Sequence, residues 1–205
     1  LSITLSTRRD TVDFINRREL EKLDGKSFIS VGQITGEFPE SSLPTPVELE
    51  LKPGCHVMFI KNDMNKRWVN GTLGVVSAID DDGTVVCVVT EDGNEYDVEK
   101  ELWENVRYKF NETEKKIEEE QIGTYVQFPL RLAWAITVHK SQGLTFRRVN
   151  IDFTGGAFAG GQTYVALSRC MSLDGISLKE PIRRNDIFVR SEVVRFAKNY
   201  NNDKI

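Results

Sequence analysis

The first residues of the chain form one predicted strand followed by one predicted helix, and this unit constrains the fold more than any other feature. The segment LSITLST is typical of a short strand. In RDTVDFINRRELEKL the apolar residues recur at roughly helical spacing, at Val12, Ile15, Leu20 and Leu23. A lone strand and helix cannot bury their own apolar faces. The unit therefore needs further strands from elsewhere in the chain.

The C-terminal part of the chain is expected to supply those strands. It predicts a helix around 132–140, a strand VNIDF, a glycine-rich loop TGGAFAGG, a helix QTYVALSRC, a strand near GISL and a terminal helix over 185–199. We expect these elements to share one sheet with the opening unit. The result is a discontinuous α/β domain over residues 1–53 and 129–205, in which the proline-containing segment 28–53 is an irregular connection.

Between these parts, residues 54–128 have a different pattern. Short alternating or β-branched runs follow one another, and the turn signals DDDG and EDGN separate several of them: HVMFIKN, GTLGVVSAI, TVVCVVT, EYDVE and IGTYVQF. This pattern predicts a small antiparallel barrel or sandwich inserted into the α/β domain. The charged run NETEKKIEEEQ, residues 111–121, is expected to be a solvated hairpin or a mobile loop.

Composition limits the classes of protein to consider. With 205 residues, 40% of them hydrophobic, the chain is long enough to bury a core. No segment approaches the run of about 20 apolar residues that spans a bilayer, and no secretory leader is evident, so we expect no membrane association. The expected location is intracellular, either cytoplasmic or, in a bacterium, nucleoid-associated. The chain begins at Leu1, inside an apolar segment, which predicts that it is part of a longer protein.

Cysteine and histidine usage predicts neither a metal site nor a disulfide. The three cysteines, Cys55, Cys87 and Cys170, are odd in number and far apart. The two histidines, His56 and His139, do not complete a zinc-ligand spacing with them.

The formal net charge of −4 does not by itself suggest a nucleic-acid-binding protein. The distribution is more informative, because acidic residues concentrate in 80–82 and 91–120, whereas five basic residues have few acids nearby in sequence: Arg131, Lys140, Arg147, Arg148 and Arg169. These residues suggest either a local anion-binding face or two solvated surfaces of different sign.

Three segments imitate phosphate or metal sites without meeting their requirements. The GKS of 25–27 has Leu20 where a P-loop needs its first glycine, and it leads from a helix into a strand, so it is a helix stop. GVVSAIDDDG is better explained as a hairpin turn than as a strand ending in metal ligands. TGGAFAGGQ lacks the GxGxxG spacing. None of them is expected to hold a Mg²⁺–nucleotide unaided.

Two other segments are more specific as a pair. AITVHKSQGLTF (135–146) and YVALSRCMSLDGISL (164–178) resemble motifs V and VI of superfamily 1 helicases in the RecD and Pif branch, which moves 5′ to 3′ on single-stranded DNA, and the first segment is more similar to the Pif type. LSTRRDTVDFIN resembles the opening of the second RecA-like domain of this group, and FIKNDMNKRWVNGTLGVV resembles the start of its inserted barrel. All four segments occur in the family's order.

The resemblance implies a fold, a function and ligands. It implies a second RecA-like domain, of the P-loop NTPase type but without the P-loop, over 1–53 and 129–205, and an inserted SH3-like barrel (2B) over 54–128. It also implies the C-terminal half of an ATP-dependent DNA helicase acting in repair, recombination or telomere and genome maintenance. Its partners would be single-stranded DNA and the N-terminal RecA-like domain of the same protein, which would hold most of the ATP and Mg²⁺. The chain alone is then expected to be inactive.

The resemblance also implies residues for the nucleotide. Arg169 would be the arginine finger, since a guanidinium meets phosphoryl oxygens well. Gln142 and Gly143 would face the same cleft, the glutamine through its amide and the glycine by allowing close backbone approach. From the residues alone, Arg169 is equally explained as a helix-terminal or surface arginine, and Gln142 with Gly143 as a polar turn.

The residues implied for DNA are hydroxyl, amide and cationic groups suited to phosphate, which they bind without reading sequence. They are Thr137, His139 and Lys140 in the first motif, Thr7 and Arg8 after the first strand, and Asn70 with Gly71 at the edge of the barrel. His139 also fits a packed or merely solvated histidine. Tyr164, Val165 and Leu167 are expected to pack their helix rather than to stack on bases.

A different class of function remains open. In this alternative the chain is a non-catalytic module, in which the barrel captures a nucleic acid or a protein and the helicase motifs are inherited relics.

Overall fold

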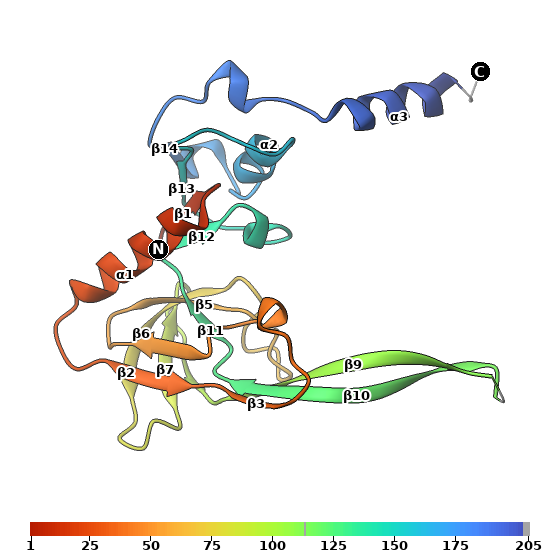
Figure 1. Ribbon diagram of the computed structural model, residues 1–205. Coiled ribbons are helices and arrows are strands. Elements are labelled where there is room, and N and C mark those ends of the chain that lie inside the picture. Colours follow the sequence, from red (N-terminus) through yellow and green to blue (C-terminus); the bar gives the residue numbers. More distant parts are fainter. Residues whose placement is uncertain (113, 203–205) are drawn as a thin grey trace. The chain divides into compact units, whose positions relative to one another are not determined.

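The computed structural model describes residues 1–112 and 114–202, and the chain divides into two compact units (Figure 1). The first unit combines Leu1–Arg17 with Trp134–Ile205, and the second is Arg18–Ala133. Residues 18–53, which the sequence analysis grouped with the α/β domain, thus lie in the second unit. The fold is mixed α/β, with one parallel sheet and several antiparallel ones.

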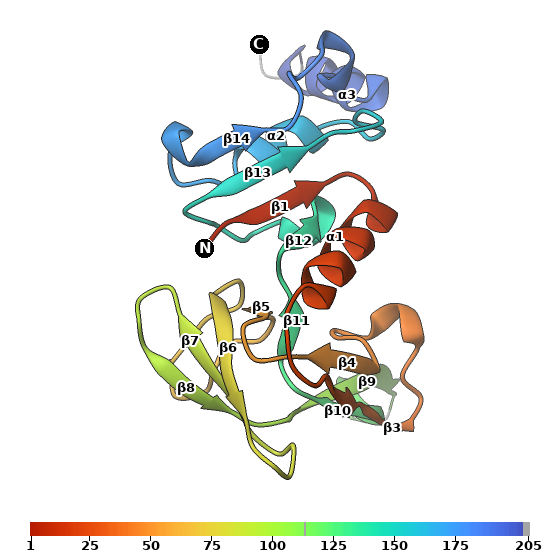
Figure 2. The ribbon, with the colours of Figure 1, turned by 90° about the vertical axis from the view of Figure 1, so that its left-hand side faces the viewer.

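The first unit is built on a four-stranded parallel sheet in the order β12-β1-β13-β14 (Figure 2). Its strands are β1 (Ile3–Ser6), β12 (Ala135–Thr137), β13 (Val149–Asp152) and β14 (Ile176–Leu178). The opening strand therefore lies between strands from the C-terminal part, as the sequence predicted. The two central strands are buried, as expected for a parallel sheet covered on both faces, and Ile3, Leu5 and Ile151 are almost completely inaccessible.

Helices cover both faces of this sheet. The N-terminal part of α1 (Arg9–Glu21) and the short α2 (Gln162–Leu167) lie on opposite faces (Figures 1 and 2). Asn16 of α1 holds the edge strand β12, because its side-chain amide donates to the carbonyl of Ala135 at 3.0 Å and accepts from the amide of Ala135 at 2.9 Å. The terminal helix α3 (Ser191–Asn202) begins six residues later than predicted.

The helix predicted around residues 132–140 is absent, and this prediction was wrong. The segment contains the end of β11 (Leu130–Leu132), the strand β12 and the start of a 3-10 turn, η2 (His139–Ser141). An apolar run this short fits a buried strand as well as a helix. Pairing of residues 135–137 with β1 decides for the strand.

The second unit consists of antiparallel sheets. A five-stranded sheet has the order β11-β5-β6-β7-β8, a three-stranded sheet the order β3-β10-β9, and β2 pairs with β4. The remaining strands are β2 (Phe28–Val31), β3 (Gln33–Gly36), β4 (Glu48–Leu51), β5 (His56–Phe59), β6 (Leu73–Ile79), β7 (Val86–Thr90), β8 (Glu95–Val98), β9 (Glu101–Asn111) and β10 (Lys116–Gln127). Three further 3-10 turns are η1 (Glu40–Ser42) in this unit and η3 (Leu173–Gly175) and η4 (Arg184–Asp186) in the first.

Turns in the second unit form where glycine follows acidic residues, as predicted. DDDG connects β6 to β7, with Gly83 at φ 67°, and EDGN connects β7 to β8, with Gly93 at φ 81°. Asp80 caps the first turn by accepting from the amides of Thr84 and Val85. The GKS segment leads from α1 into β2, and Gly25 has φ 101°, in agreement with a helix stop.

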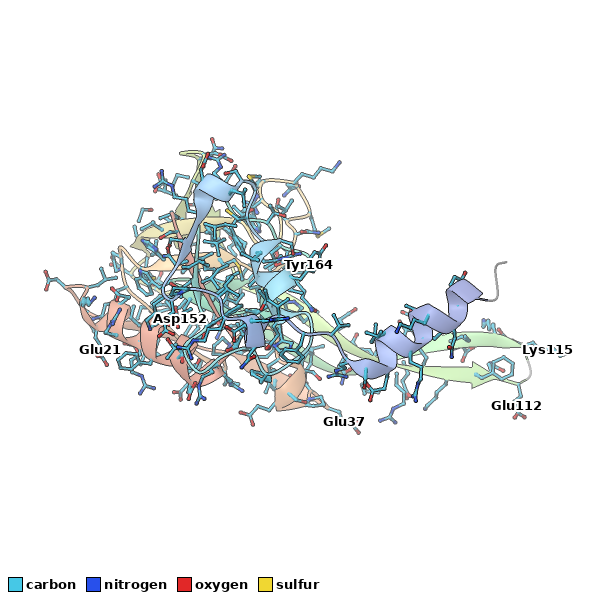
Figure 3. All side chains as sticks on the ribbon, turned by 90° about the horizontal axis from the view of Figure 1, so that it is seen from above. Glu21, Glu37, Glu112, Lys115, Asp152 and Tyr164 are labelled. Atoms are coloured by element: carbon cyan, nitrogen blue, oxygen red, sulfur yellow. The ribbon has the colours of Figure 1, made fainter. Side chains whose placement is uncertain are left out.

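The charged run 111–121 forms part of a long hairpin of β9 and β10, confirming the hairpin prediction (Figure 1); its Thr113 lies outside the described residues. Glu112 and Lys115 lie at the end of this hairpin (Figure 3). Beyond the part that pairs with β3, the hairpin exposes the large apolar side chains of Tyr108, Phe110 and Ile117.

Candidate nucleic-acid interface

The candidate site lies where the parallel strands of the first unit end. Ligands of open α/β sheets bind outside the carboxyl ends of the strands. The loops that follow β1, β12 and β13 line one open pocket there, with the residues Thr7, Arg8, Arg9, Asp10, Thr137, His139 and Phe158. Four of the residues that the sequence analysis assigned to DNA are therefore brought together: Thr7, Arg8, Thr137 and His139.

Arg8 and Arg9 are exposed cations of this pocket, and a carboxylate accompanies Arg8. Its Nε lies 3.0 Å from Oδ1 of Asp10 and its Nη2 lies 2.5 Å from Oδ2. The hydrogen bond with Arg8, together with the amide of Thr11, lowers the pKa of Asp10 to about 2. Thr7 is buried, and its hydroxyl donates to the carbonyl of Gly156 at 3.2 Å. The hydroxyl of Thr7 thus connects the loop after β1 to the loop after β13, and its donor is already used within the protein.

The loop after β12 presents His139 and Lys140 to solvent. The 3-10 turn that carries them is held by Ser141, whose buried hydroxyl donates to the carbonyl of Val138 at 2.7 Å. The amide of Lys140 donates to the hydroxyl oxygen of Thr137 at 3.3 Å. The polar residues at the centre of this segment therefore form a compact turn, which the buried Ser141 holds in place.

Gln142 and Gly143 are exposed and follow this turn. Gly143 has φ 78°, where side chains other than that of glycine are strained, and a Cβ there would meet nothing within 4 Å. The backbone conformation therefore requires glycine, and the space above it is open for a ligand.

Arg169 follows the end of α2 and contacts the loop after β12, at Ser141 and Leu144. Its Nη1 donates to the carbonyls of Leu144 at 3.1 Å and Ser141 at 3.5 Å, and its Nε donates to the carbonyl of Val165 at 3.0 Å. These bonds connect the two motif segments and match the alternative of a helix-terminal arginine. To reach a phosphate, the guanidinium has to leave these carbonyls.

The other residues of α2 only partly follow the prediction. The buried side chains of the helix are Gln162, Thr163 and Ala166. Tyr164 is 76% exposed and is labelled on α2 in Figure 3. Leu167 is also exposed, so the expectation that Tyr164 and Leu167 pack the helix was wrong. Val165 is partly buried.

Asn70 and Gly71 belong to the second unit, in the loop between β5 and β6. The amide of Asn70 donates to Oδ1 of Asn62 at 2.8 Å, and Gly71 has φ 95°. The loop is also held by Asp63, which accepts two hydrogen bonds from the guanidinium of Arg67, and these bonds lower its pKa to about 2. Asn70 itself is exposed.

Sequence reasoning missed Asp10 and Phe158. Asp10 lies within the first turn of α1, where an acid is commonly explained by the helix dipole. Phe158 lies in a glycine-rich loop that was tested only as a phosphate motif. An aromatic residue between glycines, directly after a buried strand, is the signal that indicates it.

The described residues contain no group of three or more histidine, cysteine, aspartate or glutamate side chains placed to hold a metal ion. None of the helices in residues 1–112 and 114–202 is long and apolar enough to span a membrane.

Comparison with known proteins finds similar helicases, although no family model matches the chain. The ATP-dependent DNA helicase Pif1 of Bdellovibrio bacteriovorus is 33% identical over 201 residues, which cover 96% of this chain and 43% of that protein. A double mutant of the Pif1 helicase from Bacteroides superposes with a TM-score of 0.86 and 36% identity, covering 99% of this chain and 46% of that one. Bacteroides Pif1 in complex with ADP-AlF3 and single-stranded DNA gives 0.73 and 37%, covering 98% and 45%. The chain is thus a homologue of the Pif1 family of DNA helicases and spans less than half the length of these relatives.

Proposed function

We propose that the chain is the C-terminal half of an ATP-dependent 5′ to 3′ DNA helicase motor, which holds part of the single-strand track and supplies an arginine to the nucleotide. The observation that carries this proposal is the convergence of two motif segments, the one after β1 and the one after β12, on one pocket at the carboxyl ends of the parallel strands. A helicase that shares 37% of the sequence has been solved in complex with both ADP-AlF3 and single-stranded DNA.

The domain assignment belongs to the same proposal. The parallel sheet with helices on both faces supports a RecA-like second domain, and the five-stranded antiparallel sheet supports an SH3-like barrel. We propose the barrel over 54–128 and the RecA-like domain over 1–53 and 129–205.

The chemistry of the pocket suits the backbone of a single strand. Arg8 and Arg9 supply cations, Thr137 supplies a hydroxyl and His139 a ring nitrogen. Lys140 adds a cation on the exposed turn next to His139, and all of these groups bind phosphate irrespective of sequence. Asn70 and Gly71 are proposed as further backbone contacts from the second unit.

The nucleotide is proposed to be ATP with Mg²⁺, held mainly by a preceding RecA-like domain. The residues of this chain fit a supporting role. Gly143 leaves open space above it and Gln142 is exposed beside it, and the guanidinium of Arg169 contacts the carbonyl of Leu144 in the same loop. When bound, ATP supplies the free energy that changes the distance between two domains. Arg169 would leave the carbonyls of Leu144 and Ser141 to neutralise phosphoryl charge.

Binding of single-stranded DNA is the first test. We expect the chain to bind a fluorescent oligothymidylate at low salt, and Arg8→Ala and Lys140→Ala each to lower both the affinity and the salt dependence, by about 0.7 in log–log slope per lost phosphate contact. Arg195→Ala on α3 removes a charge outside the pocket and is the matched control. No binding at 50 mM salt would exclude the proposed track.

Arg169 is tested by ATP hydrolysis. In a protein that joins this chain to a P-loop domain, Arg169→Ala is expected to reduce DNA-stimulated hydrolysis on the order of 10³-fold, with Arg169→Lys restoring little, because a lysine lacks the planar fork. The affinity for single-stranded DNA is measured in parallel, since the variant also loses the bonds to the motif loop. Retention of most of the hydrolysis rate would remove Arg169 from this role, and ATP turnover by the chain alone would contradict the half-motor.

A further inference from the structure

Phe158 is an exposed aromatic residue inside the candidate DNA pocket, and no role has been assigned to it so far. Its side chain is 66% exposed, although it lies directly after the buried strand β13 and before α2. Its ring centroid lies 6.2 Å from that of His139, with an angle of 33° between the planes. A large apolar side chain left in water forgoes roughly 1.5–3 kcal/mol of burial. The exposure of this ring among polar groups of the pocket therefore indicates a role in binding.

The backbone that carries Phe158 is fixed by buried side chains. Oε1 of Gln162 accepts hydrogen bonds from the amides of Phe158 at 2.9 Å and Ala159 at 3.0 Å. Gln162 is only 4% exposed. One residue earlier, the amide of Ala157 donates to Oδ1 of the buried Asp186 at 3.1 Å. A carboxylate and an amide oxygen thus hold three consecutive peptide units.

The same loop is tied to the loop after β1, which carries Arg8. The hydroxyl of Thr7 donates to the carbonyl of Gly156, and Gly156 has φ 83°, which other residues adopt only with strain. A Cβ on Gly156 would also come within 3.2 Å of Oδ1 of Asp186. The position of Phe158 relative to Arg8 is therefore set before any ligand arrives, which lowers the entropy cost of binding.

The pocket combines phosphate donors with an aromatic face. Proteins that bind single strands without sequence preference use this combination, in which cations follow the backbone and aromatic rings stack on bases. Phe158 and His139 are already within the range of a direct aromatic pair, so they leave no slot for a base between them. The remaining face of Phe158 is the surface available to a base.

We propose that Phe158 stacks on an unpaired base and makes this pocket selective for single-stranded over double-stranded DNA. The inference rests on the proposed single-strand track and adds to it the side chain that distinguishes unpaired bases from paired ones. In a duplex the faces of the bases are covered by their neighbours, so a duplex offers only phosphates to Arg8 and Lys140. A single strand offers both phosphates and base faces.

The test compares variants on three oligonucleotides, of which the two single strands have equal charge. Binding is measured by fluorescence anisotropy with a 15-mer oligothymidylate, a 15-mer of abasic sites and a DNA duplex. Phe158→Leu keeps an apolar side chain but removes the ring. It is expected to weaken binding of the oligothymidylate roughly 5- to 100-fold and to leave the abasic strand and the duplex unchanged, whereas Phe158→Trp keeps the affinity. Phe196→Leu, the same change at a 71% exposed position on α3, is the control and is expected to bind like the parent.

The outcomes separate this inference from the function on which it rests. If the parent chain binds no single strand, both the proposed track and the inference fail. If the parent binds and Phe158→Leu binds equally well, only the stacking role is overturned. If Phe158→Leu weakens the abasic strand as much as the oligothymidylate, the residue shapes the loop and does not stack, which also overturns the inference.

Discussion

At the scale of single residues, the candidate pocket contains a carboxylate where an anion is expected to bind. Asp10 neutralises part of the charge of Arg8 and would repel a phosphate. Both side chains are largely exposed, at 54% and 64%, so water screens the ion pair and it contributes little to stability. Asp10 is therefore expected to limit the affinity of the proposed track for DNA.

This explanation predicts the effect of removing the charge. Asp10→Asn is expected to raise the affinity for single-stranded DNA about 2- to 10-fold at low salt, with the gain fading as salt screens the site. The folded state is expected to lose little stability. Glu192→Gln removes the same charge from α3, outside the pocket, and is the control. Weaker binding by Asp10→Asn would instead mean that Asp10 positions Arg8.

A second prediction at this scale concerns Gly32 in the second unit. A Cβ there would lie 2.6 Å from the ring and the hydroxyl of Tyr125, which is completely buried. The tyrosine cannot move away, because its hydroxyl contacts the carbonyl of Pro46 at 2.9 Å and the hydroxyl of Thr45 at 3.0 Å. Gly32→Ala is expected to lower the free energy of unfolding by roughly 1–3 kcal/mol, measured by urea denaturation. An equal cost in a Tyr125→Leu background would refute the proposed clash.

At the scale of elements, the sequence predicted correctly the helices, strands and turns that depend on neighbouring residues. The opening strand and helix, the hairpin turns at DDDG and EDGN, and the glycine that follows α1 have local chemical signals, and the structure confirms them. The segment 132–140 has none, because residues 135–137 become a strand only by pairing with β1, more than 100 positions away in sequence. Phe158 was missed for a related reason: its pocket exists only once three loops meet.

The β9–β10 hairpin gives a prediction at the same scale. In its outer part, 107–120, the described residues are exposed apart from the half-buried Asn111, whereas residues 123–126 pair with β3. Replacing 107–120 by Asn-Gly between the paired residues Val106 and Gln121 retains a suitable turn. The shortened protein is expected to unfold within a few degrees of the parent, at a cost of roughly 1 kcal/mol or less.

The inner part of the hairpin provides the contrast. A Cβ on Gly123 would lie 2.1 Å from the carbonyl oxygen of Glu37. Gly123→Ala is therefore expected to separate β10 from the end of β3 and to lower the midpoint temperature of thermal unfolding more than the shortened hairpin does. If the shortened hairpin were the more damaging change, the outer strands would have a structural role that their exposure does not reveal.

At the scale of the whole molecule, charge and function are arranged locally. The net charge of −4 opposes binding of a polyanion, yet the pocket brings Arg8 and Arg9 to the carboxyl end of β1, beside the loop after β12. Association is therefore expected to depend on a few local contacts and to be strongly sensitive to salt. The same charge distribution determines how the fold responds to acid.

Every described carboxyl group with a resolved shift has a pKa below its ordinary value: Asp10, Glu19, Asp63, Asp80, Glu120, Asp152 and Asp186. For Asp63 the largest cause is the hydrogen bond with Arg67. The unfolded chain then binds protons at higher pH than the native one. The stability contributed by these groups is present above about pH 4 and is lost as the pH falls toward 2.

His56 adds an earlier step in the same direction. Partial burial lowers its pKa from the ordinary 6.5, since the charged ring is desolvated. The unfolded state is therefore protonated first, and stability decreases as the pH falls from about 6.5 through the lower native pKa. The free energy of unfolding, measured in urea between pH 8 and 3, is thus expected to decline in two windows. His56→Gln should remove the first window and keep the second, while Asp63→Asn should reduce only the second. A free energy that rises on acidification from pH 7 to 5 would contradict the burial of the neutral ring as the cause, because only a native pKa above that of the unfolded chain gives that sign.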